Sequence, residues 1–177
     1  MLGQITKATT ATPAAVAGNT GDGTIGTVTI GAGAKAGVYK VTCVEPAMDA
    51  GEFIVEDPDG VNVGVATVAS EFTGGGLTFT VADGATDFAS GDAFTITIAA
   101  GSGKYKEYNP ANTDGSESAV AVLLDAVDAT GADKDGVAIA RDAEVKSGAL
   151  EWFSGATSNQ KTTGEGELKA NAGIIAC

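Results

Sequence analysis

The chain has no histidine, one arginine, one tryptophan and two cysteines among its 177 residues. The absence of histidine removes the commonest general base and the commonest metal ligand at neutral pH. Two cysteines do not make a disulfide framework, and their scarcity fits a reducing cytoplasm. We therefore predict no catalytic residues, no metal site and no cofactor, and an enzyme is the class that this sequence fits least.

Basic residues and long apolar runs are also scarce. Ten Lys and Arg stand against 23 Asp and Glu, which gives a formal net charge of −13. Phosphate groups and anionic lipid surfaces bind through Lys and Arg, so we exclude nucleic acid and membranes as partners. No stretch approaches the ~18 apolar residues of a membrane span. The first residues lack the basic start and apolar core of a signal peptide, so we expect synthesis in the cytoplasm.

The sequence instead has 26 glycines and many short runs of alternating Thr, Val and Ile. Such runs separated by Gly/Asp turns favour a mainly β protein with helix confined to short pieces. We predict a small β-sandwich module over residues 22–98, with an immunoglobulin-like shape as one form it could take. The expected strands cover residues 24–30, 38–44, 53–55, 61–68, 77–83 and 93–99.

Residues 1–21 are rich in Thr, Ala and Gly and show no apolar periodicity. We predict a flexible arm here, disordered as a free peptide, which could add a strand to the sheet edge of a partner. Deletion of residues 2–18 is then expected to leave the fold intact.

The C-terminal part follows a fixed order of weak motifs. Asn112-Thr113-Asp114-Gly115 leads into the apolar run AVAVLLDAV at 119–127, predicted as a strand buried on both faces. The turn ATGADKDG and a second predicted strand at 136–145 come next. Leu150-Glu151-Trp152, a predicted short helix at 159–170 and the terminal strand GIIAC complete the order.

In that order, residues 103–177 resemble the lambda-type phage head decoration proteins. The resemblance implies a β-clip-like unit, residues 99–177, that assembles as a homotrimer at local three-fold positions on the outer capsid surface of the virion. It implies the major capsid protein as partner and a bacterial host cytoplasm as the site of synthesis. The family's arm binds the shell, which assigns capsid contact here to Leu2, Gln4, Ile5 and Thr6. The head would thereby be stabilised against internal DNA pressure.

Residues 22–98 depart from that pattern, because simple decoration proteins have no domain there. This module could bind a host glycan or protein, which makes a virion-surface adhesion module the main alternative. A tail-tube or other virion structural protein is a further alternative. Whether the strand at 93–99 belongs to the module or to the decoration domain stays open at this point.

Several residues have both a functional and a structural interpretation. Arg141 could pair with a carboxylate across a subunit interface or make a weak surface ion pair. Trp152, with Leu150 and Phe153, could fill a trimer contact or the protomer core, and the core is the better explanation. The aspartates at 57, 59, 83, 87 and 92 could bind calcium but are more simply explained as turn formers.

Overall fold

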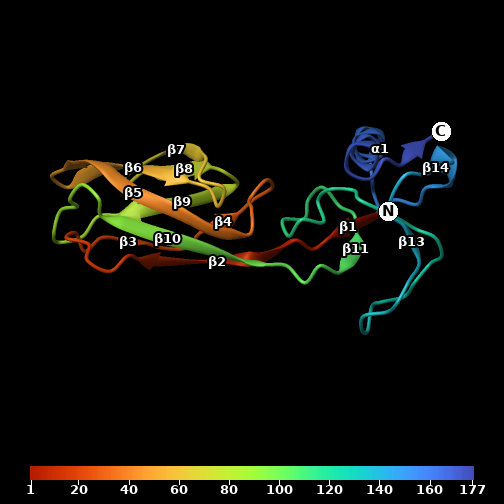
Figure 1. Cartoon of the computed structure of the whole chain (residues 1–177), viewed down its shortest axis with the longest axis horizontal. Helices are drawn as coiled ribbons and strands as arrows, with labels where there is room; N and C mark the ends of the chain where they lie inside the picture. Colours follow the sequence, from red (N-terminus) through yellow and green to blue (C-terminus); the bar gives the residue numbers. More distant parts are fainter. The chain divides into compact units, whose positions relative to one another are not determined.

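The computed structural model describes all residues, 1–177, and divides them into two compact units. One unit contains Lys7–Gly101, and the other contains Met1–Thr6 together with Ser102–Cys177 (Figure 1). The chain is mainly β, as predicted, with several antiparallel sheets. No helix in the structure is long and apolar enough to cross a membrane.

The unit formed by residues 7–101, here called the module, consists of two sheets. Five strands in the order β2-β10-β5-β6-β7 make the larger sheet: Lys7–Ala15, Ala93–Ala100, Gly37–Ala47, Ala50–Glu56 and Asn62–Thr67. The smaller sheet is built around β9 (Leu77–Ala82). Its other strands are β3 (Thr24–Ile25), β4 (Thr29–Ile30) and β8 (Glu71–Gly74).

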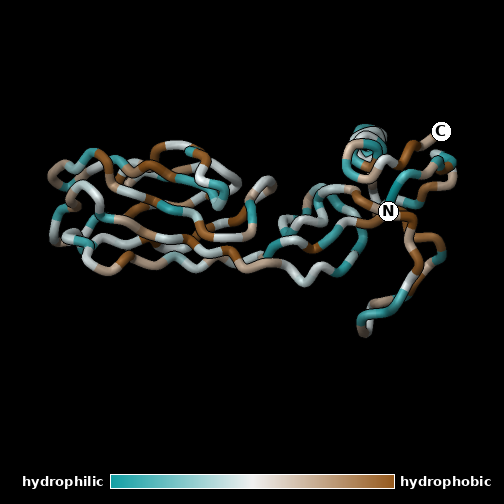
Figure 2. The backbone as a smooth tube through the Cα atoms, in the orientation of Figure 1, coloured by the Kyte–Doolittle hydropathy of each residue, from teal (hydrophilic) through white to brown (hydrophobic).

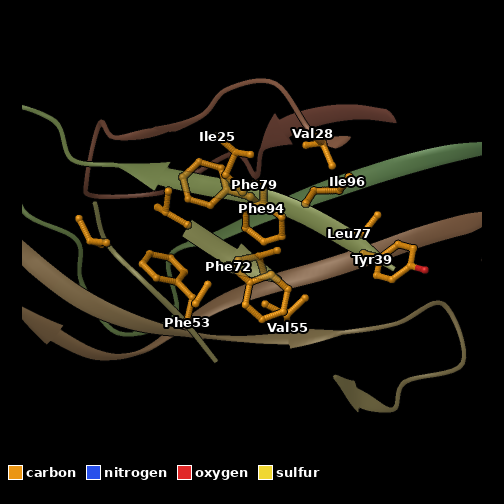
Figure 3. Close-up of a cluster of buried hydrophobic side chains, with 14 of the residues drawn as sticks. Ile25, Val28, Tyr39, Phe53, Val55, Phe72, Leu77, Phe79, Phe94 and Ile96 are labelled. Atoms are coloured by element: carbon orange, nitrogen blue, oxygen red, sulfur yellow. The ribbon is translucent and has the colours of Figure 1, made fainter. Parts of the chain in front are cut away.

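Alternation along these strands sends one set of side chains into a single core. Tyr39, Phe53 and Ile96 come from the larger sheet, and Leu77 and Phe79 come from the smaller one (Figure 3). All five are buried. Figure 2 shows the hydrophobic residues along the strands and the hydrophilic residues at the turns. The module therefore has a core of its own, as expected for a unit of about 100 residues.

The second unit, here called the C-terminal unit, has short strands and one helix. Two antiparallel pairs join β1 (Leu2–Gln4) to β11 (Tyr105–Glu107) and β12 (Val122–Leu123) to β13 (Ala138–Ile139). A parallel pair joins β14 (Glu144–Val145) to β15 (Ile175–Ala176). A 3-10 turn, η1 (Ser147–Ala149), precedes the helix α1 (Ser158–Ala172). The core of the C-terminal unit consists of Tyr108, Ala119, Leu168, Ala172 and Ile174.

Helix α1, SNQKTTGEGELKANA, forms although it contains two interior glycines, Gly164 and Gly166, which disfavour a helix. Thr157 caps its start: the Thr157 Oγ1 accepts from the Gln160 N–H (3.3 Å), and the Gln160 side chain accepts from the Thr157 N–H (2.9 Å). Gly173, at φ 65°, ends the helix in the left-handed conformation that glycine adopts without strain. The predicted helix at 159–170 is therefore confirmed and is longer at both ends.

The structure divides the chain differently from the predicted 1–21, 22–98 and 99–177. Residues 2–4 form β1 of the C-terminal unit and residues 7–15 form β2 of the module, because both segments find a neighbouring strand. Deletion of residues 2–18 would therefore remove two paired strands, so these residues are not the free arm that the sequence suggested. The strand at 93–99 belongs to the module as β10, where it pairs with β2 and β5.

Two predicted C-terminal strands are much shorter than expected. Only Val122–Leu123 of the run 119–127 is a strand, and it is half-buried, with Leu124 exposed. The run 136–145 contains two separate strands, β13 and β14. Both sequences are apolar enough for longer strands, but neither finds a continuous neighbouring edge within this chain.

Candidate functional site

Of the predicted capsid-binding residues, Leu2 and Gln4 lie on β1, which is bonded on both of its edges, and Ile5 and Thr6 follow directly after it. The Leu2 N–H donates to the Ala121 carbonyl (2.9 Å), while β11 pairs with β1 on the opposite edge. The Ile5 N–H donates to Lys104 (2.9 Å), and the Thr6 N–H donates to Asp114 (2.8 Å). These bonds occupy the main-chain groups that strand addition to a partner would use.

Two glycines allow this close packing of β1. A Cβ on Gly3 would lie 2.3 Å from the Ser116 carbonyl oxygen and 2.5 Å from the Ser116 Cα, so only glycine fits there. Gly115 has φ 103°, and a Cβ on it would meet the Thr6 Oγ1 at 2.0 Å. The turn at 114–116 therefore lies directly against β1, and both glycines are needed for that approach.

Asp114 is the electrostatic centre of that turn. Its Oδ1 accepts from the Ser116 N–H (3.1 Å) and hydroxyl (2.5 Å), and its Oδ2 accepts from the Lys106 Nζ (3.0 Å). Burial alone would raise the pKa of Asp114, but the bonds from Ser116 and Lys106 outweigh burial and lower it to about 2. The ionised carboxylate thus fixes the turn to β11 at neutral pH.

Trp152 and Phe153 are partly buried and pack against the core of the C-terminal unit. Tyr108 is fully buried, and its ring meets the Trp152 ring at 6.1 Å and 70° and the Phe153 ring at 6.2 Å and 67°. Burial, with Glu167 nearby, raises the pKa of the Tyr108 hydroxyl. Leu150 is half-buried beside them. Trp152 and Phe153 thus pack against the protomer core through Tyr108, while each remains partly exposed.

Arg141, in contrast, is exposed and makes no ion pair within the chain. Lys146, five residues later, is in the same situation. Lys40, Lys134, Lys161 and Lys169 also make no ion pair, so Arg141 and Lys146 are two of six such cations. Both therefore keep their full capacity to bind an external anion.

A long loop, residues 124–137, projects from the β12–β13 pair and is exposed over nearly its whole length. Beside it lies an open cavity of about 1000 Å³, also lined by β11 and by residues 149–152. An ion pair between Lys104 and Asp133 connects the loop to the chain next to β11. The sequence predicted a hairpin turn here, but it did not predict that Leu124 and Val137 would be exposed.

Of the five aspartates considered for calcium, Asp57 and Asp92 act as turn formers in the structure, whereas the buried Asp83 Oδ1 has no hydrogen-bond partner. The Asp92 carboxylate accepts from the backbone N–H groups of Thr20, Gly21 and Ala89 at 2.8–3.0 Å. Burial by itself would raise the pKa of Asp92, but the three hydrogen bonds together lower it. Asp57 accepts from the N–H groups of residues 59 and 61, and the Lys35 ammonium bonds both Asp57 (2.5 Å) and Asp59 (2.6 Å). The Asp57 and Asp92 carboxylates therefore stabilise the loops whose backbone N–H groups they accept from.

Comparison with known proteins gives one strong match. The family model of the bacteriophage lambda head decoration protein D matches residues 1–174, well beyond the 103–177 that the motifs indicated. The match therefore includes the module. No curated protein sequence matches the chain.

Solved structures give weaker similarities. Two crystal structures of FlgL from Xanthomonas campestris share 21% and 22% identity with the chain, at TM-scores of 0.40 and 0.39. They cover 56% and 59% of this chain but only 33% and 32% of FlgL. The flagellar hook junction protein FlgK from Burkholderia pseudomallei shares 20% identity at a TM-score of 0.37, over 64% of this chain and 20% of FlgK. Similarity at this level carries no functional argument.

Proposed function

The chain belongs to the bacteriophage lambda head decoration protein D family, and from that membership we propose that it is a capsid decoration protein that cements the phage head. It binds the major capsid protein on the outer surface as a homotrimer at local three-fold positions and stabilises the shell. The match of the family model to residues 1–174 is the observation that carries this proposal.

The capsid contact that we propose uses the side chains of Leu2, Gln4, Ile5 and Thr6. Their main chain is already bonded to residues 103–107, 114 and 121, so β1 can be presented to the shell in an ordered form. Ordering a free arm would cost roughly 1–2 kcal/mol per residue of backbone. A preformed strand avoids that cost, which supports binding by a short segment.

Three such segments on one trimer add avidity. Once one protomer is bound, the next contacts become intramolecular, which can raise overall affinity on the order of 10²–10⁴. The net charge of −13 suits an outer coat that binds through few specific contacts, because it repels nucleic acid and other decorated particles.

The direct test adds purified protein to phage heads that lack their decoration protein. Co-sedimentation and cryo-EM should find the chain on the outer surface at three-fold positions, and decorated heads should survive heating or chelation better than bare heads. Absence of binding to heads of the parent phage would refute the proposal. Heads that bind the protein without gaining stability, while virions lacking it adsorb poorly, would favour the adhesion role of the module instead.

A further inference from the structure

Five aspartates in the chain are followed directly by glycine, and the structure holds these five pairs differently. They are Asp22-Gly23, Asp59-Gly60, Asp83-Gly84, Asp114-Gly115 and Asp135-Gly136. In an aspartate–glycine pair the backbone nitrogen of the glycine can attack the aspartate carboxyl, because glycine has no Cβ to shield that nitrogen. The reaction needs a carboxyl that is free to rotate and a nitrogen that is not held in a hydrogen bond.

Two of the pairs have both reacting groups in hydrogen bonds. The Asp59 and Asp114 carboxylates each accept from a lysine ammonium group, as described above. The Gly60 N–H donates to a backbone carbonyl (2.9 Å), and the Gly115 N–H donates to a glutamate carboxylate (2.6 Å). Ring closure at either pair therefore has to break a bond to a charged group and a bond of the glycine nitrogen first.

The pairs at Asp22 and Asp83 are held by packing against each other. The Asp22 Oδ1 accepts from the Thr86 N–H (2.8 Å). A Cβ on Gly84 would lie 2.1 Å from that oxygen and 2.6 Å from the Gly23 nitrogen, and the Asp83 Oδ1 is buried. Neither carboxyl can turn toward the nitrogen of its glycine without opening this part of the module.

Asp135-Gly136 has none of these restraints. Both residues are exposed, in the loop 124–137. The structure gives the Asp135 carboxylate no ion pair or hydrogen bond, and the Gly136 N–H donates to no acceptor. We propose that Asp135-Gly136 is a site of spontaneous backbone modification, where the aspartate cyclises to a succinimide that reopens in part as isoaspartate.

The reaction needs no reactant other than water. The Gly136 nitrogen attacks the Cγ of the protonated Asp135 carboxyl and forms an N–Cγ bond, while the nitrogen loses its proton and the carboxyl loses its hydroxyl group, together as one water molecule. Water then adds to one of the two ring carbonyls. Addition at Cγ breaks the new bond and restores aspartate. Addition at the main-chain carbonyl carbon breaks the original peptide bond and leaves isoaspartate, in which the chain runs through Cγ.

Isoaspartate lengthens the main chain by one carbon and puts a free carboxylate on the Cα of the modified residue. Gly136 packs closely at this point, because a Cβ on it would lie 3.2 Å from both the Leu123 Cδ1 and the Val127 Cγ2. The next residue, Val137, accepts from the Leu124 N–H (2.9 Å) at the base of the loop. The added atom shifts this segment against its partners, so the Leu124 amide should lose protection from hydrogen exchange.

The experiment keeps the full chain in water labelled with heavy oxygen, at neutral pH, and follows each Asp–Gly peptide by mass spectrometry. Every ring opening places one solvent oxygen in the peptide, and fragmentation separates isoaspartate from aspartate. The 135–136 peptide should gain label at least on the order of tenfold faster than the 59–60 and 114–115 peptides, which must first break a hydrogen bond to a charged group. Equal labelling of all the pairs, or faster labelling at 83–84, would overturn the proposal.

The same measurement in urea separates the fold from the sequence. All the pairs should then label at comparable rates, because no hydrogen bond or packing holds them. If 135–136 still labelled fastest in the unfolded chain, its neighbours in sequence would select it, and the structural argument would be refuted.

Asp135→Glu keeps the charge, but its longer side chain has to close a larger ring, so label at this position should be lost. The Leu124 amide should then be as protected in aged protein as in fresh protein, whereas in aged wild type its exchange should be faster. Asp133→Glu is the matched control, because Asp133 lies in the same loop but precedes Lys134, and it should label like the wild type. Undiminished labelling in Asp135→Glu, or unchanged Leu124 exchange in aged wild type, would contradict the inference.

Discussion

Replacement of Gly164 by alanine tests whether helix α1 is held by close packing against Trp152 or by its own tendency to be helical. A Cβ at this position would lie 2.6 Å from the Trp152 Cζ3, 2.9 Å from its Cη2 and 3.2 Å from the Tyr108 Cε1. The ring and the helix backbone are in direct contact there. Gly166, in the same helix, has nothing within 4 Å of its Cβ position and is the matched control.

The expected magnitudes have opposite signs. Each Gly→Ala change inside a helix gains about 1 kcal/mol of helix propensity. At Gly166 nothing opposes that gain, so stability should rise by about 1 kcal/mol. At Gly164 the added methyl overpacks the core, which typically costs about 1–3 kcal/mol and outweighs the gain. The two variants should therefore differ by about 1–3 kcal/mol in the free energy of unfolding, with Gly164→Ala the less stable.

The assay is urea unfolding followed by Trp152 fluorescence, because the only tryptophan of the chain lies in the C-terminal unit. With an m-value of about 1–2 kcal/mol/M for a unit of this size, the midpoints should differ by roughly 1 M. If Gly164→Ala were as stable as Gly166→Ala, the contact between Trp152 and the helix would not limit packing, and the argument for the aromatic core would fail.

Three other predictions concern the turn, the first strand and the module. Because folding lowers the pKa of Asp114 to about 2, its stabilisation should be complete above the unfolded pKa, near 4, and disappear as the pH falls toward 2. Asp114→Asn should flatten that part of the pH profile, read by Trp152 fluorescence; an unchanged profile would contradict the assignment. A Gln4→Cys/Tyr105→Cys pair, made in a Cys177→Ser background, should form a disulfide across facing residues, and its oxidised and reduced forms should bind heads equally; weaker binding of the oxidised form would mean that β1 must leave β11. Replacing residues 7–101 with an Asn-Gly turn should leave the urea midpoint of the C-terminal unit unchanged, since β2 and β10 end side by side at Lys7 and Ala100; a collapse of that transition would make the module part of the fold.

The sequence alone indicated the strand content and the family of the protein. Period-two alternation with Gly/Asp turns is a local signal, so the strands of the module and the capped helix near the C-terminus could be predicted from neighbouring residues. The order of motifs after residue 103 indicated the family that the model over residues 1–174 confirms. The absence of histidine and the excess of acidic over basic residues are matters of composition and need no structure.

The tertiary structure alone decided where residues 1–15 lie and which apolar residues are left uncovered. Leu2 pairs with residues more than 100 positions away, and β2 pairs with β10, so no local pattern could assign either strand. Thr- and Ala-rich segments suit a free arm and an edge strand equally well, and only an available neighbouring edge selects between them. Leu124 and Trp152 are both apolar in sequence, but packing buries the ring of one against Tyr108 and leaves the other to solvent, because burial depends on contacts that the chain makes at long range.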